Sequence, residues 1–336
     1  MLVLFALGGF ISPARGQELP ALAEQIGTVN GVCFSPDSRF VALSTTSLDV
    51  KIIDTAKLEV SCTLKGHAKR IWAASFCPAG RFIASVSGTY HTPNDPGEVI
   101  VWDAIAGMES IRLLGHRGLV YCVAYSPDGK TLATGSTDKT AKVWDPESGK
   151  LLANLEGHTA AVRSLVFTPD GKFLVSGSFD RTVKIWDLAT GKESRSFLAH
   201  EGGVACIALS PDGKTLATTN RPVRTPVAPG EIKLWDFATG KEKASLKGHV
   251  ERVIGVAFSP DGKMLATGGG FYQARGELTV WDAVTFKKIA SLPGHKQWIE
   301  SVAFSPDGQT LISGGGYNSI VGEFKRWDVN KIKEGK

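Results

Sequence analysis

The dipeptide Trp-Asp recurs along most of this chain, and this recurrence restricts the fold more than any other feature. Six copies begin at Trp102, Trp144, Trp186, Trp235, Trp281 and Trp327. Ile53-Asp54 stands one interval earlier and gives a degenerate seventh copy. A motif that recurs in this way along most of a chain is typical of repeat architectures, in which each repeat is a small unit that buries its apolar faces against its neighbours. The chain therefore contains seven similar units.

A second signal runs in phase with the first. A histidine precedes each Trp-Asp pair, at His67, His116, His158, His200, His249 and His295. A serine or threonine follows each histidine after 18 residues, at Ser85, Thr134, Ser176, Thr218, Thr267 and Ser313. Turn sequences such as Ser126–Gly129 and Ser259–Gly262 separate short apolar runs. Each unit therefore consists of short strands joined by tight turns.

These motifs resemble the WD-repeat (WD40) family, and the resemblance covers residues 17 to about 330. It implies an all-β fold: a seven-bladed β-propeller of four-stranded antiparallel blades. It also implies a buried, hydrogen-bonded tetrad of histidine, hydroxyl residue, turn aspartate and tryptophan in each regular blade. Blades 3 and 4 contain all four types, namely His116, Thr134, Asp138 and Trp144, and His158, Ser176, Asp180 and Trp186. Blade 1 has Leu43 and Ile53 in two of the slots, so we expect it to lack the network altogether.

The two ends of the chain suggest how the ring closes. The chain ends before an outer strand can follow Trp327-Asp328, and Gln17–Leu22 align with that missing strand. We therefore expect the N-terminal strand to pair with the last blade, which protects two exposed sheet edges and makes residues 17–336 a single propeller.

Residues 1–16 resemble a signal peptide. The apolar run Leu2–Ile11 is too short to span a bilayer and is followed by small residues before Gln17. This interpretation predicts export to the periplasm or the extracellular space. A cytoplasmic protein with a frayed apolar tail or a misassigned start is the alternative. The five cysteines have no disulfide or metal spacing, and we interpret them as free, buried thiols.

Four insertions distinguish the repeats from one another. The interval from histidine to tryptophan is 28 residues in blades 3 and 4, 35 in blades 2 and 5, and 32 in blades 6 and 7. The extra residues lie between the second and third strands, in Gly88–Gly97, Asn220–Gly230, Gly270–Gly276 and Gly316–Gly322. The resemblance implies that these loops stand on one face, the top.

The inserted loops contain aromatic and arginine residues, which dominate binding energy at interfaces. The candidate recognition residues are Tyr90, His91, Arg221, Arg224, Phe271, Tyr272, Arg275 and Tyr317. Packing of these side chains against their own blades is the alternative. Each loop ends in Gly-Glu four residues before the tryptophan, at Glu98, Glu231, Glu277 and Glu323. An even offset places each glutamate on the strand face of its tryptophan, so we predict that it replaces the aspartate as the histidine's acceptor; a metal or acid–base site is the alternative.

A second candidate set lies at the start of the first strand in each blade. The resemblance implies that these positions line the top of the central channel and contact partners. They are Arg70, Trp72, Tyr121, Arg163, Arg252, Trp298 and Glu300, with Phe179 in the turn of blade 4. Burial between blades is the alternative for Trp72. The arginines make this face basic, so the predicted partner surface is acidic or anionic.

Catalytic and nucleic-acid signatures are weak in this sequence. The formal net charge of +5 falls short of the basic stripe of a nucleic-acid binder, so no specific nucleic acid is expected. The sequence has no phosphate loop, no His-Glu-x-x-His and no Gly-x-Ser-x-Gly motif. We predict a monomeric, non-catalytic scaffold that binds a protein or peptide partner on its top face, without metal or cofactor. The alternative is a propeller enzyme or a module that binds a sugar or another small molecule on the same face.

Overall fold

The computed structural model describes residues 17–18, 27–90, 95–221, 229–270, 275–317 and 321–334. At positions 17, 18, 221, 317 and 321 the description covers the backbone only. The predicted signal peptide, residues 1–16, lies outside the described residues. Export and the cleavage before Gln17 therefore stay predictions.

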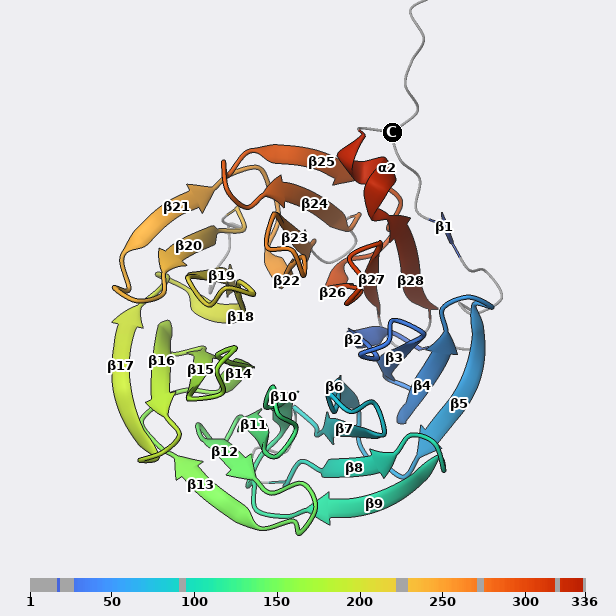
Figure 1. Ribbon diagram of the computed structural model, residues 1–336, viewed down its shortest axis with the longest axis vertical. Coiled ribbons are helices and arrows are strands. Elements are labelled where there is room, and N and C mark those ends of the chain that lie inside the picture. The colour runs from blue at the N-terminus through green and yellow to red at the C-terminus, as the bar shows by residue number, and fades with distance from the viewer. Residues whose placement is uncertain are drawn as a thin grey trace, which may run out of the picture.

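Seven four-stranded antiparallel sheets stand in a ring, and each is one blade of a β-propeller (Figure 1). In six of the blades the sequence order of the strands is also their order from the axis to the rim, here called a to d. This arrangement confirms the fold predicted from the repeats.

The strands have the following bounds. Blade 1 contains β2 (Val29–Phe34), β3 (Phe40–Thr45), β4 (Asp49–Asp54) and β5 (Glu59–Lys65). Blade 2 contains β6 (Ile71–Phe76), β7 (Phe82–Ser87), β8 (Val99–Asp103) and β9 (Met108–Leu113). Blade 3 contains β10 (Val120–Tyr125), β11 (Leu132–Ser136), β12 (Ala141–Trp144) and β13 (Leu151–Leu155). Blade 4 contains β14 (Val162–Phe167), β15 (Phe173–Ser178), β16 (Thr182–Asp187) and β17 (Lys192–Leu198).

The remaining blades follow the same plan. Blade 5 contains β18 (Gly203–Leu209), β19 (Thr215–Arg221), β20 (Ile232–Asp236) and β21 (Glu242–Leu246). Blade 6 contains β22 (Val253–Phe258), β23 (Met264–Gly269), β24 (Glu277–Asp282) and β25 (Lys288–Leu292). Blade 7 contains β26 (Ile299–Phe304), β27 (Thr310–Tyr317), β28 (Val321–Asp328) and β1 (Gln17–Glu18). Because neighbouring strands are antiparallel, the b–c and d–a turns share one face, the top, and the a–b and c–d turns share the other.

The ring closes in blade 7, where the two ends of the chain meet. Gln17 lies opposite Arg326 and Glu18 lies opposite Lys325 in an antiparallel pair, as the alignment of the ends predicted. Arg326 Nη1 also donates to the carbonyl oxygen of Thr55 in blade 1 at 3.1 Å. The seam between the last and first blades is therefore held by contacts from both ends.

A short helix, α2 (Val329–Lys333), follows the last strand and was not expected from the repeats. Asp328 caps it, because its carboxylate accepts from the backbone N–H groups of Asn330 and Lys331. Val329 and Ile332 are buried in the apolar cluster that blades 6 and 7 share. The helix thus covers core that would otherwise meet solvent. In the described part of the chain, no helix is both long enough and apolar enough to cross a bilayer.

The core lies between the blades. Each a strand has a completely buried valine or isoleucine at its start, which is its first residue in six blades and its second residue, Val204, in β18. The seven residues are Val29, Ile71, Val120, Val162, Val204, Val253 and Ile299. The apolar clusters combine side chains from adjacent blades, as where Leu64 of blade 1 and Ile71 of blade 2 pack together. All five cysteines are free, as their spacing predicted, but only Cys77 is buried and the other four are half-buried.

A hydrogen-bonded tetrad stabilises every blade from 2 to 7. The tryptophan Nε1 donates to the serine or threonine hydroxyl at 2.7–3.1 Å. That hydroxyl lies 2.7–2.8 Å from the histidine Nε2. The histidine Nδ1 lies 2.6–3.3 Å from a carboxylate oxygen. A neutral imidazole protonated at Nδ1 completes this chain of bonds from indole to carboxylate.

The carboxylate comes from two different places. In blades 3 and 4 it belongs to Asp138 and Asp180 of the short b–c turn. In the four blades with long loops it belongs to the glutamate that ends the loop, at Glu98, Glu231, Glu277 and Glu323, as the even offset predicted. Burial raises the pKa of Glu98, but hydrogen bonds from His67 and Ser87 outweigh it and hold that pKa at about 2.

Blade 1 has no tetrad among its described residues. Leu43 and Ile53 fill the hydroxyl and indole positions, and both are completely buried. Asp49 takes the position of the glutamates; it accepts from the Thr45 hydroxyl at 3.0 Å and pairs with Lys51 at 3.1 Å. Apolar packing therefore replaces the network, in agreement with the sequence analysis.

Candidate functional site at the channel mouth

The candidate site begins with an irregularity that is repeated in all seven blades. Each a strand shifts register against its b strand directly after the buried first valine or isoleucine. One residue of each a strand therefore has no partner on strand b, and these are Asn30, Trp72, Tyr121, Arg163, Ala205, Ile254 and Glu300. A bulge reorients the side chain of its extra residue. Here the bulges present seven side chains around the axis.

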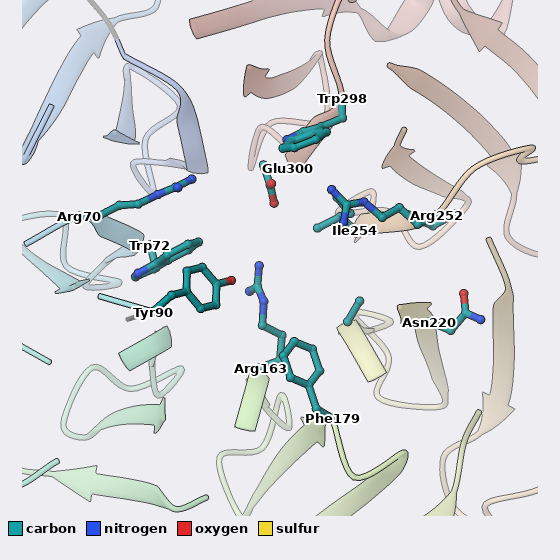
Figure 2. A pocket seen from close by; sticks show the side chains of 12 residues that line it. Arg70, Trp72, Tyr90, Arg163, Phe179, Asn220, Arg252, Ile254, Trp298 and Glu300 are labelled. Carbon is teal, nitrogen blue, oxygen red and sulfur yellow. The ribbon is translucent and has the colours of Figure 1, made fainter. Parts of the chain in front are cut away.

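A cavity of about 230 Å³ lies on the top face at the centre of the ring (Figure 2). We call it the channel-mouth cavity, and it is lined by Arg70, Trp72, Tyr90, Arg163, Phe179, Ala205, Asn220, Arg252, Val253, Ile254, Trp298 and Glu300. Seven of the eight predicted channel residues are in this set. The eighth, Tyr121, lies behind the wall, where its ring contacts Trp72 and Phe179.

Three arginines dominate the chemistry of the cavity. Arg163 is the bulge residue of blade 4, whereas Arg70 and Arg252 directly precede the a strands of blades 2 and 6. Figure 2 shows all three guanidinium groups directed into the same space, from three sides of the ring.

Each arginine is held by an aromatic ring. The guanidinium carbon of Arg70 lies 4.3 Å from the centre of the Trp72 ring, and that of Arg252 lies 4.7 Å from the Trp298 ring. Arg163 lies 4.9 Å from the ring of Tyr121. Stacking of this kind fixes a guanidinium while leaving its edge N–H groups able to bind a ligand.

Hydrogen bonds position two of the arginines further. Arg70 Nη2 donates to Asn30 Oδ1, and Asn30 Nδ2 donates to the carbonyl oxygen of Ile71 at 2.6 Å. Arg252 Nε donates to the carbonyl oxygen of Gly270 at 3.2 Å. Asn30 thus links the blade 1 bulge to the arginine of blade 2, a contact that the sequence analysis missed.

The electrostatic balance of the cavity is positive. Burial lowers the pKa of Arg70, yet arginine starts so high that it stays protonated at neutral pH. Burial also lowers the pKa of Arg163, but the nearby Tyr90 and Glu300 outweigh it and raise that pKa overall. Glu300 is the sole carboxylate that lines the cavity within the described part of the chain. Three guanidinium groups therefore face one carboxylate.

An aromatic cluster forms one wall of the cavity. The ring centres of Trp72 and Tyr90 are 4.9 Å apart, and those of Tyr121 and Phe179 are 6.0 Å apart. Trp72 is 6% exposed and its Nε1 donates to the carbonyl oxygen of Gly88 at 3.0 Å, while Tyr121 is 2% exposed. Burial is thus the main role of these two side chains. Tyr90, at 48% exposure, is the member of the cluster that a ligand can reach most easily.

Two glycines place the residues of the opposite wall. A Cβ atom on Gly269 would overlap the carbonyl oxygen of Arg252, and one on Gly315 would overlap that of Trp298. Both glycines end or nearly end the b strands of blades 6 and 7. Their lack of a side chain lets the segments before β22 and β26 approach closely, and the sequence analysis did not single them out.

Most of the loop candidates cannot be placed. His91, Arg224, Phe271 and Tyr272 lie outside the described residues, and Arg221 and Tyr317 are described by their backbone alone. Arg275 is exposed at the end of the blade 6 loop. In blade 2, Lys69 forms an ion pair with Asp95 and donates to the carbonyl oxygen of Pro96 at 2.6 Å. This end of the loop packs against its own blade, so recognition by the loops stays a prediction.

One feature of the sequence marks the bulges, although the sequence analysis did not use it. The residue after each bulge position is small in all seven blades: Gly31, Ala73, Cys122, Ser164, Cys206, Gly255 and Ser301. Adjacent a strands approach closely there, since a Cβ on Gly255 would lie 3.2 Å from the backbone nitrogen of Val302. A large or polar residue followed by a small one therefore marks the bulge position in six of the seven blades, and blade 5, with Ala205 there, is the exception.

Comparison with known proteins points to one family. The family model described as "WD40: WD domain, G-beta repeat" matches residues 58–103, 108–145, 149–187, 191–236, 240–282 and 286–321, which together exceed half of the chain. Similar curated proteins include Coronin-7 of Rattus norvegicus, 36% identical over 80 residues, or 24% of this chain and 8% of the relative. WD repeat-containing protein SL1-17 of Schistosoma mansoni is 38% identical over 115 residues (33% of this chain, 35% of the relative). GATOR2 complex protein WDR24 of Xenopus laevis is 28% identical over 134 residues (39% and 16%). The matched segments thus cover well under two thirds of each relative.

Proposed function

The chain belongs to the WD40-repeat family, and on this basis we propose that it is a non-catalytic scaffold that holds a protein or peptide partner on its top face. The observation that carries this proposal is the channel-mouth cavity, where arginine and aromatic side chains converge on a rigid ring. These residue types supply most of the binding energy at protein interfaces. A similar WD-repeat protein is described as part of the GATOR2 complex, a role in an assembly that accords with the proposal.

The arrangement of the histidines favours binding over catalysis. Each of the six described histidines has both ring nitrogens in a tetrad. Burial lowers the pKa of His116 and of His200, which favours the neutral imidazole. These side chains are therefore committed to stability rather than to proton transfer or metal binding.

The charge of the cavity suggests the kind of partner surface. Among the described residues that line the cavity, Arg70, Arg163 and Arg252 face a single carboxylate, so an acidic partner segment gains complementary charge. Tyr90 and Trp298 lie beside these arginines at the mouth of the cavity, where a partner segment can contact both kinds of side chain. We therefore propose that binding is tightest at low ionic strength and weakens as salt screens the charges.

Affinity capture with matched charge reversals tests the proposed face. The tagged wild-type protein, Arg252→Glu and Lys130→Glu are used to capture proteins from an extract of the source cells, with quantification by mass spectrometry. Lys130 is exposed in the a–b turn of blade 3, so its reversal changes charge equally on the opposite face. We expect a partner that is retained by wild type and Lys130→Glu and lost with Arg252→Glu. Equal retention by all three proteins contradicts binding at the top face.

The channel-mouth cavity also favours a second candidate, a module that binds a small molecule or sugar on the same face. A cavity of about 230 Å³ lies below the usual size of ligand pockets, but its convergent polar groups and aromatic rings suit a small ligand. Native mass spectrometry of the purified protein distinguishes the two functions. A bound small molecule that is lost in Arg163→Gln, with no captured protein, supports the second candidate.

A further inference from the structure

The outer strand of blade 3 has an open edge with exposed apolar side chains and no charge within the strand. β13 is the last strand of its sheet, and Figure 1 shows it on the outside of the ring. Leu151 and Leu152 are 40% and 49% exposed, and a register shift against β12 accounts for two neighbouring exposed residues. An edge of this kind offers backbone N–H and C=O groups to another strand, with apolar side chains beside them.

The other regular blades with a described outer strand have a charge where blade 3 has a leucine. Leu151 lies opposite Trp144 of the tetrad. The residues opposite the tetrad tryptophans of blades 2, 4, 5 and 6 are Glu109, Glu193, Glu242 and Lys288. A charge on an edge strand opposes pairing with a second strand. Blade 3 therefore lacks a protection that these blades have.

Contacts inside blade 3 do not account for this leucine. In blade 4 the charged residue pairs with a lysine of strand c, since Glu193 lies 2.6 Å from Lys184. Lys142 is the corresponding lysine of blade 3, and it donates to Asn154 Oδ1 at 2.6 Å instead. Leu151 thus occupies the place of an ion-pair partner while its own side chain is exposed at the rim.

The charges at the two ends of β13 identify the partner as a second copy of this chain. Lys150 directly precedes the strand, Glu156 directly follows it, and Ala153 lies midway between them. Both charged residues are exposed. When two copies pair antiparallel about a two-fold axis at Ala153, Lys150 of each copy lies opposite Glu156 of the other. The Leu152 side chains of the two copies are then diagonal neighbours across the axis.

The outer strand of blade 1 provides the nearest comparison. β5 also has opposite charges at its ends, Glu59 and Lys65, but its apolar residues are buried or half-buried and Ser61 is exposed between them. Antiparallel pairing of β5 with β13 places Lys65 opposite Lys150, which is unfavourable. Complementary end charges and exposed apolar side chains therefore occur together in β13 and not in β5.

We propose that this chain forms a weak homodimer in which the β13 strands of two copies pair antiparallel, centred on Ala153. The dimer differs from the monomer that the sequence analysis predicted. Because β13 lies at the rim, the dimer leaves the channel-mouth cavity open and does not depend on a partner at the top face. One short strand from each copy buries little area, so the affinity is low.

Sedimentation velocity of the full chain at increasing protein concentration measures the dimer dissociation constant. The variants are Lys150→Glu, Glu156→Lys and Leu152→Lys, with Leu198→Lys as the control. Leu198 is 54% exposed and lies in β17, the outer strand of blade 4. All four side chains are exposed, so each variant should fold, and its melting temperature checks this.

The two charge reversals should each weaken the dimer and rescue one another. Lys150→Glu and Glu156→Lys each place like charges opposite one another at both ends of the strand pair, so each should raise the dissociation constant by about tenfold or more. An equimolar mixture of these two variants should dimerise about as well as wild type, because every opposed pair in the mixed dimer again has opposite charges. Leu152→Lys should raise the dissociation constant by about tenfold or more, and Leu198→Lys should change it by less than about twofold.

The results that contradict the homodimer are distinct from one another. A wild type that stays monomeric at every concentration overturns it. A wild-type dimer that neither charge reversal weakens, or a mixture of the two variants that stays monomeric, overturns the antiparallel pairing of β13. If the wild type is monomeric and affinity capture yields a protein that Leu152→Lys loses, β13 binds a different partner and the second copy is wrong.

Discussion

Replacement of Glu98 by alanine tests how much a loop-terminal glutamate contributes to the fold. Glu98 Oε2 accepts from His67 Nδ1 at 2.9 Å, from the backbone nitrogen of Ala68 at 3.0 Å and from the Ser87 hydroxyl at 2.8 Å. Its Oε1 accepts from Arg112 Nη1 at 2.8 Å. Glu98→Ala removes all four hydrogen bonds in a single change while leaving the backbone of β8 unaltered.

The loss in the free energy of unfolding depends on which buried donors lose their hydrogen-bond acceptor. The side chain of His67 is fully buried, so its Nδ1–H becomes an unsatisfied donor at a cost of about 1–3 kcal/mol. The Ser87 hydroxyl is also buried and loses about 1 kcal/mol, whereas Arg112 is partly exposed and loses less. The free energy of unfolding should therefore fall by about 3 kcal/mol. With an unfolding entropy of about 2 cal/mol/K per residue, this lowers Tm by about 4 °C.

Differential scanning calorimetry with a neighbouring control measures this effect. Glu109 also pairs with Arg112, at 2.7 Å, but its side chain is more exposed than that of Glu98. Glu109→Ala removes a surface ion pair and should lower Tm by about 1 °C or less. If Glu98→Ala and Glu109→Ala lower Tm equally, the role of Glu98 as a tetrad acceptor is wrong.

The pH dependence of the Glu98 effect gives an independent check. The pKa of Glu98 is about 2 in the folded protein and 4.5 ordinarily, so the unfolded chain takes up the proton first as pH falls. Because its pKa is lower in the folded state, ionised Glu98 stabilises the fold fully above pH 4.5, and this contribution is lost as pH falls from 4.5 towards 2. The Tm difference between wild type and Glu98→Ala should thus shrink over that range. A difference that is constant from pH 7 to pH 3 contradicts the argument.

Two further substitutions test blade 1 and the cavity wall. Leu43→Ser should lower the free energy of unfolding by about 3 kcal/mol or more, because it leaves a cavity and a buried hydroxyl without the histidine and indole partners of the other blades. Denaturant unfolding measures this change. As a control, Leu48→Ser at a partly exposed position should change the free energy of unfolding by less than about 1 kcal/mol. Gly315→Ala should displace the Trp298 carbonyl and lower Tm, and tryptophan fluorescence should report the altered indole; Gly191→Ala, with open space around the added Cβ, should leave that fluorescence unchanged.

The repeats made the fold predictable because their signal is redundant. Each blade from 2 to 7 repeats the spacing of 18 residues from histidine to hydroxyl, and this spacing corresponds directly to one hydrogen bond, as between His158 and Ser176. The glutamate replacement was predictable for the same reason, since an even offset on a strand fixes the side-chain face. The helix α2 was missed although Asp328 is a good N-cap residue, because five residues form too short a segment to leave a periodic pattern.

The candidate site was less predictable, because a ring brings together residues that are far apart in the sequence. The resemblance placed Arg70, Arg163 and Arg252 near the channel, but spacing along the chain gives no distance across the axis. The hydrogen bond from Arg70 to Asn30 joins positions 40 residues apart, and nothing local in the sequence marks it. The loop residues depend least on the repeat, and spacing predicts their location but not their conformation.

The bulge explains how one architecture combines a fixed frame with a variable site. In every blade the residue before the bulge is a buried valine or isoleucine and the residue after it is small, because both pack between blades. The bulge residue has no partner on strand b, so its identity changes from Arg163 to Glu300 without affecting the ladder. Substitutions at bulge positions that line the cavity without being buried, such as Arg163 and Glu300, should therefore alter what the channel-mouth cavity binds, and substitutions at tetrad positions should alter stability. The two kinds of residue lie close together in each blade but contribute to separate properties, which is why function in this protein can be tested without unfolding it.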